Sequence, residues 1–129
     1  MPKLPFLLAG LAVISAPAVA GPRMDPEARL ARAVEGRVPG EPVDCISLNT
    51  VRSSRMIDDT AIVFDAGHTI YVNRPRSGAE VLSSDDTLVT RTHSNRLCSI
   101  DRAEVLDGST YRVRQPIFLG EFIPYRRVR

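Results

Sequence analysis

The sequence predicts a mainly β protein: a small antiparallel β-sandwich or barrel of about six to eight short strands, preceded by one short N-terminal helix. From residue 43 onward, short β-prone runs alternate with Pro, Gly, Asn and Asp turn signals, a texture typical of antiparallel strands. The helix is predicted from Asp25-Pro26-Glu27, where an N-cap carboxylate precedes a proline at the first helical position.

Residues 1–20 are predicted to be a cleaved signal peptide. Lys3 supplies a positive charge, Leu4–Ile14 supplies a short apolar run, and Ala18-Val19-Ala20 places small residues where signal peptidase reads. Because a membrane-spanning helix needs about 20 apolar residues, this run is too short to remain as an anchor. Cleavage would leave a periplasmic or secreted chain that begins at Gly21 and has no membrane span. An uncleaved anchor and a plain disordered tail are the alternatives.

Residues 21–42 are predicted to form a leader with a short helix and a Pro/Gly-rich linker. The helix is expected over 25–36, with a narrow apolar stripe that consists of Leu30, Ala33 and Val34. Gly36 is expected to end it, and the breaker residues in 38–42 form the linker. The narrow stripe leaves two alternatives open, in which the helix docks on the β domain or stands off it.

Residues 43–125 are predicted to form a single β-rich domain. Its strand candidates are 45–48, 55–57, 60–65, 69–73, 88–93, 96–100, 111–118 and 120–124. Gly67 is expected to adopt a positive φ in the hairpin loop 66–68, and 75–86 is expected to be a long exposed connection. Residues 126–129 follow as a basic tail, for which solvation is favoured over contact with lipopolysaccharide, a phosphate surface or a partner protein.

Cys45 and Cys98 are predicted to form a disulfide. Export would place them in an oxidising compartment, where an even number of cysteines is usually paired. Two free thiols, a cysteine nucleophile served by His68 or His93, and a zinc site are the alternatives. The chain has no Cys-x-x-Cys or His-x3-His spacing, and a nucleophilic thiolate would be captured by the other cysteine. We therefore favour the disulfide.

Composition excludes several classes of partner and assigns none. Without residues 1–20, 16 arginines stand against 15 acidic residues, so the net charge is +1. This balance gives no electrostatic reason to expect binding to nucleic acid or to an acidic membrane surface, and the absence of Trp argues against an aromatic carbohydrate-binding platform. No cofactor is expected. The partner stays open, with a protein or a cell-envelope component favoured.

The chain contains five ordered motifs: Cys45-Ile46-Ser47-Leu48, Arg52–Phe64, Ile70–Asn73, Arg96–Cys98 with Asp101, and Leu119–Pro124. Together they resemble a family of short exported proteobacterial proteins that is catalogued only as a domain of unknown function. The resemblance implies export and brings no activity, substrate or catalytic residue. In that family's pattern, many members have a third cysteine after the Tyr-x-Asn strand and a fourth before Leu-Gly-x-Phe, whereas 74–78 and 117–118 contain none here. The pattern implies that the absent cysteines would pair with each other, which leaves Cys45 to pair with Cys98.

No set of candidate site residues stands out from the sequence. The candidates are two histidines, two Asp-Asp pairs and two serines: His68, His93, Asp58-Asp59, Asp85-Asp86, Ser53 and Ser54. Histidines bind metals or sense pH, paired carboxylates serve in catalysis or calcium binding, and the serines lack a Gly-x-Ser-x-Gly context. Structural or exposed roles are favoured for all of them, so no catalytic, cofactor-binding or metal-binding residue is assigned.

The favoured function is that of an exported, non-enzymatic binding or envelope-associated module. The alternative is a small hydrolase or metal-dependent enzyme that uses His68 and His93 with an aspartate. That alternative requires both imidazoles and a carboxylate in one concave pocket. A structural, stress-protective envelope protein is a third interpretation, which the sequence does not separate from the first.

Overall fold

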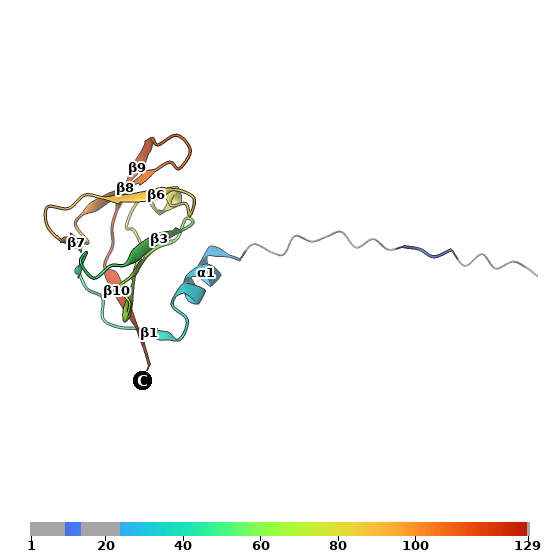
Figure 1. The fold of residues 1–129 in the computed structure, drawn as a ribbon, viewed down its shortest axis with the longest axis horizontal. Helices are drawn as coiled ribbons and strands as arrows, with labels where there is room; N and C mark the ends of the chain where they lie inside the picture. The colour runs from blue at the N-terminus through green and yellow to red at the C-terminus, as the bar shows by residue number, and fades with distance from the viewer. Residues whose placement is uncertain (1–9, 14–23, 129) are drawn as a thin grey trace, which may run out of the picture.

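The computed structural model describes residues 10–13 and 24–128, so most of the predicted signal peptide lies outside the described residues. The described chain forms helix α1 (Pro26–Ala33), a 3-10 helix η1 (Ala79–Val81) and strands β1 (Arg37–Pro39), β2 (Cys45–Ser47), β3 (Ser53–Ile57), β4 (Ala61–Asp65), β5 (Thr69–Asn73), β6 (Thr87–Thr90), β7 (Arg96–Cys98), β8 (Arg102–Leu106), β9 (Val113–Phe118) and β10 (Phe122–Arg127). These strands pair antiparallel (Figure 1). The predicted mainly β fold with a short N-terminal helix is confirmed.

The largest sheet has five strands in the order β1-β10-β5-β4-β3. Two hairpins connect β3, β4 and β5, and β10 returns to pair with β5, which places Phe122 opposite Asn73. Two smaller sheets, β2-β7 and β6-β8-β9, form a second layer. The sheets of the described residues form a sandwich-like arrangement and do not close into a barrel.

The larger core cluster lies between the five-stranded sheet and the second layer. Because successive side chains of a strand point to opposite faces, Ile62 and Phe64 of β4 both reach this core. Phe64 meets Phe122 of β10 edge to face, with 5.7 Å between the ring centroids. The second layer contributes buried residues from four strands: Ile46, Leu97, Ala103, Val105 and Ile117.

Helix α1 packs on the opposite face of the five-stranded sheet (Figure 1). Leu30 is 4% exposed and shares a second core cluster with Ala61 and Val63 of β4. The structure thus adopts the docked alternative, and β4 is buried on both faces, which explains its unbroken apolar run. Two ion pairs also tie α1 to the β domain: Arg29–Asp58 and Arg74–Glu27. Neither helix in the described residues is long and apolar enough to cross a membrane.

Two predicted connecting segments contain regular structure. Within the predicted linker, Arg37–Pro39 pairs as β1 with the end of β10, so β10 runs through Arg127 into the predicted basic tail. Within the predicted exposed connection, η1 is followed by Leu82, which is 2% exposed in the larger core. The described residues contain ten strands, more than the six to eight predicted. Three-residue strands such as β1 escape prediction because they are too short to show an alternating pattern in the sequence.

Asn73 is a buried polar side chain at the end of β5 and is fully shielded from solvent. Its amide nitrogen donates to the carbonyl oxygen of Gly120 at 2.8 Å, and its Oδ1 accepts from the Gly120 N–H at 2.9 Å. Gly120 has no room for a side chain, because a Cβ there would collide with the carbonyl oxygen of Arg74. The amide therefore ties the turn between β9 and β10 to the central sheet.

The Asn73→Ala variant is expected to lower the free energy of unfolding by about 1–3 kcal/mol, because both polar groups of Gly120 lose their buried partner. Urea denaturation measures this loss. Asn49→Ala is the matched control, since Asn49 is exposed in a turn and its replacement should change stability by no more than about 0.5 kcal/mol. Equal effects of the two substitutions would contradict the assigned role of Asn73.

Candidate functional site

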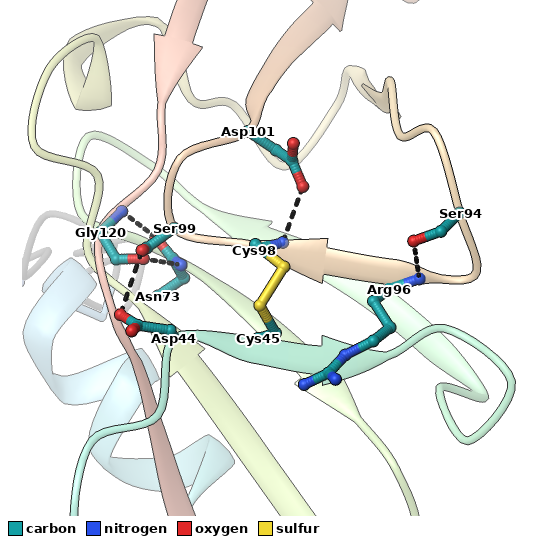
Figure 2. Close-up of a disulfide and its surroundings, with 9 residues drawn as sticks. All are labelled: Asp44, Cys45, Asn73, Ser94, Arg96, Cys98, Ser99, Asp101 and Gly120. Carbon is teal, nitrogen blue, oxygen red and sulfur yellow. Dashed lines mark hydrogen bonds between the residues drawn. A yellow bond between two sulfur atoms is a disulfide. The ribbon is translucent and has the colours of Figure 1, made fainter.

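The predicted disulfide is present and joins the two strands of the smallest sheet (Figure 2). Cys45 of β2 lies directly opposite Cys98 of β7, with 4.0 Å between their Cα atoms. The backbone N–H of Cys98 donates to Oδ2 of Asp101 at 2.8 Å, which anchors the turn after β7. Because both sulfur atoms are bonded to each other, the free-thiol, nucleophile and zinc alternatives do not apply to this state.

The two segments in which the resembled family carries further cysteines lie side by side. Ser77 forms an antiparallel bridge with Phe118, and the N–H of Arg76 donates to the carbonyl oxygen of Phe118 at 2.9 Å. Cysteines placed in these segments would therefore lie near each other. Membership in the family stays a prediction.

The candidate histidines lie in separate loops. Exposed His68 lies in the loop between β4 and β5 of the five-stranded sheet, whereas exposed His93 lies in the loop between β6 and β7. Ser53 and Ser54 are exposed on β3, an edge strand. Residues 10–13 and 24–128 contain no group of three or more His, Cys, Asp or Glu side chains that could hold a metal ion. The structure thus places the two histidines that the enzymatic alternative needs in different loops.

The two Asp-Asp pairs hold loops in place. Asp58 accepts hydrogen bonds from Nη2 of Arg29 at 2.9 Å and from the N–H of Ser84 at 2.7 Å. The Arg29 guanidinium is the main reason that the pKa of the Asp58 carboxyl is lowered, with the Ser84 N–H adding to the effect. Asp86 accepts from the N–H of Gly108 at 3.1 Å, which joins two turns. The other member of each pair is exposed: Asp59 in the first pair and Asp85 in the second.

An arginine-lined recess lies at the end of the five-stranded sheet where β10 finishes. Figure 1 marks this end of the chain with C. It has a volume of about 530 Å³, opens to solvent, and is lined by Arg52, Gly67, His68, Thr69, Arg126 and Arg127. Three arginines and one histidine therefore line a single concavity. None of its lining side chains is a carboxylate.

Antiparallel pairing brings these distant segments together. Arg126 of β10 lies opposite Thr69 at the start of β5. Arg52 immediately precedes β3, and its backbone N–H donates to the carbonyl oxygen of Asp65 in β4 at 2.7 Å. The recess is therefore built from the ends of neighbouring strands and from the loop between β4 and β5.

Arg37 of β1 fixes the loop that forms one wall of the recess. Its Nη1 donates to the carbonyl oxygen of His68 at 3.0 Å, and its Nη2 donates to that of Gly67 at 3.3 Å. The N–H of Gly67 donates to Oδ1 of Asp65 at 2.8 Å. Gly67 has the predicted positive φ, 80°, and a Cβ there would come within 3.0 Å of Cζ of Arg52. The Arg52 guanidinium thus packs against a loop that is held in one shape.

The three arginines of the recess have no acidic partner within residues 24–128. The salt bridges in this part of the chain use other arginines: Arg29, Arg74, Arg91 and Arg114. Guanidinium groups form bidentate, charge-assisted hydrogen bonds with carboxylate and phosphate groups. This arrangement is therefore suited to hold an anionic group.

The sequence interpretation missed this recess. It assigned 126–129 to a solvated tail and gave no role to Arg37 or Arg52. The available signal was the strand pattern of 120–124, which continues through Tyr125 to Arg127 and so carries two arginines into the sheet. Their neighbours across the sheet depend on pairing, which no local pattern specifies.

No protein-family model, curated protein or solved structure matches this chain.

Proposed function

We propose that the mature chain is an exported, non-enzymatic binding module whose arginine-lined recess holds an anionic group of a protein or cell-envelope component. The observation that carries the proposal is the convergence of Arg52, Arg126 and Arg127 on one recess that no carboxylate lines. Export is supported by the signal-like residues 1–20 and by the disulfide, since disulfides persist in oxidising compartments.

The arrangement favours binding over the hydrolase or metal-dependent alternative. That alternative needs His68, His93 and an aspartate within hydrogen-bond or metal-ligand reach of one another. The two histidines belong to loops of different sheets, and the recess that His68 borders does not include His93. We therefore place the function in recognition by the recess.

Site-specific photocrosslinking in cells tests this function with no candidate ligand chosen in advance. A photoreactive phenylalanine analogue replaces His68 at the recess or, as the matched control, His93 in the other exposed loop. We expect a defined adduct, identified by mass spectrometry, from position 68 and none from position 93. Equal adducts at the two positions, or none at position 68, would refute the recess as the binding site.

A further inference from the structure

We propose that the group held in the recess is a terminal phosphate monoester, a tetrahedral dianion that is carried by a small molecule or by a lipid headgroup. This inference rests on the proposed function and names the chemical class of the anion, and it extends the possible carriers from an envelope lipid to a soluble phosphate. It follows from the number of arginines that line the recess, from their origin in different elements of the sheet, and from the hydrogen bonds that hold its wall.

The number of cations exceeds what a carboxylate needs. A carboxylate carries one charge and is satisfied by one bidentate arginine. A phosphate monoester carries about −1.5 to −2 charges near neutral pH and presents three acceptor oxygens. Arg52, Arg126 and Arg127 together supply three positive charges, and none of the three is offset by a salt bridge within residues 24–128. The charge of the recess therefore matches a dianion better than a monoanion.

The donors also approach from different elements. Arg52 comes from the segment before β3, while Arg126 and Arg127 come from the end of β10. Thr69 of β5 also lines the recess, and β5 lies between β10 and β3 in the sheet order. A planar carboxylate uses donors in one plane, whereas the oxygens of a phosphate point in three directions. Donors on several sides are therefore suited to a tetrahedral group.

The wall of the recess is ordered before any ligand arrives. The Arg37 guanidinium donates hydrogen bonds to the carbonyl oxygens of Gly67 and His68, and the Gly67 N–H donates to the Asp65 carboxylate. The Arg52 guanidinium rests against Gly67, so part of its conformational entropy is already lost in the free protein. Binding then costs less ordering, which favours affinity for a small anion.

The first experiment measures ligand class by isothermal titration calorimetry on the disulfide-bonded chain without its signal peptide. The probes are inorganic phosphate, glucose 1-phosphate and, for comparison, acetate. We expect saturable binding of both phosphates, at least tenfold tighter than any binding of acetate, and weaker binding as sodium chloride screens the charges. Acetate binding as tight as phosphate binding, or no phosphate binding, would overturn the inference.

Two variants with the same net charge locate the site. Arg126→Ala/Arg127→Ala removes two recess cations, whereas Arg96→Ala/Arg112→Ala removes two exposed arginines that do not line it. The recess variant should bind phosphate roughly tenfold to hundredfold more weakly, and the control should bind as the parent does. Arg52→Gln provides an independent test away from β10 and should weaken binding in the same direction. Equal losses in the recess and control variants would indicate general surface charge and overturn the assignment.

Vesicle sedimentation separates the two sources of the phosphate. Vesicles of phosphatidylcholine with phosphatidic acid present a phosphate monoester, whereas those with phosphatidylglycerol present a phosphodiester. Recess-dependent binding to the phosphatidic acid vesicles and not to the phosphatidylglycerol vesicles, together with binding of the soluble phosphates, supports a lipid headgroup. Recess-dependent binding of soluble phosphates without vesicle binding supports a small-molecule source.

If position 68 crosslinks in cells but no phosphate probe binds, the ligand class is wrong while the proposed function stands. If phosphate binds and position 68 gives no adduct, the proposed cellular function fails instead.

Discussion

The double variant Cys45→Ser/Cys98→Ser is expected to lose about 4 kcal/mol of unfolding free energy. The disulfide closes a loop between residues 53 positions apart, and the chain-entropy model gives this magnitude for a loop of that length. Small domains have only about 5–15 kcal/mol of total stability. The melting temperature should fall by roughly 15–30 °C, because each kcal/mol shifts a domain of about 100 residues by several degrees.

Thermal and guanidinium unfolding, followed by circular dichroism, measure this loss. Reduced parent protein is the matched comparison, and it should unfold at the same temperature and guanidinium concentration as the double variant. Adding reductant to the double variant should leave its stability unchanged. Mass spectrometry of the unreduced parent should give a chain two hydrogens lighter than the reduced one. A parent whose stability does not respond to complete reduction would refute the bracing role of the bond.

Phe122→Ala is expected to destabilise the fold by about 3–5 kcal/mol, because it removes a large side chain that is fully buried between the layers. The substitution leaves a cavity beside Phe64, whose ring it contacts edge to face. Phe118→Ala is the matched control, since the Phe118 side chain is 44% exposed and belongs to neither core cluster. It should cost less than about 1 kcal/mol.

Guanidinium unfolding curves of both phenylalanine variants check this expectation, with the slope of each transition used to confirm that the unfolded states are comparable. The recess lies at the far end of β10 from Phe122, so the folded Phe122→Ala protein should retain phosphate binding. Similar losses of stability for Phe118→Ala and Phe122→Ala would contradict the layered core described above.

Local chemistry explains the parts of the fold that could be predicted. Pro26 and Glu27 mark the start of α1 because a proline suits the first helical position and a carboxylate suits the first turn, whereas the side chain of the N-cap residue Asp25 makes no capping hydrogen bond. Gly67 turns the β4–β5 hairpin because a positive φ is inexpensive only without a Cβ. The apolar run Ala61–Phe64 was readable as a strand because every one of its side chains is buried. These signals lie within a few residues of one another.

The segments that escaped prediction depend on remote partners. Arg37–Pro39 contains a proline and no alternation, yet it becomes β1 because the end of β10 lies beside it. Leu82 looked exposed between turn residues, but the fold covers it in the larger core. Helix α1 docks because Leu30 meets the face of β4 that the second layer leaves open. In each case the partner is distant in sequence.

The sequence alone determined the mainly β class, the N-terminal helix and the pairing of Cys45 with Cys98, because these follow from turn chemistry, capping and the number of cysteines. Only the tertiary structure decided the arginine-lined recess. The register that sets Arg126 beside Thr69, and the hairpin that carries Arg52 to the same end of the sheet, are properties of strand pairing. Arginines that are far apart in a nearly neutral sequence line one recess because the sheet brings the ends of their strands together, and no described carboxylate residue lines it with them.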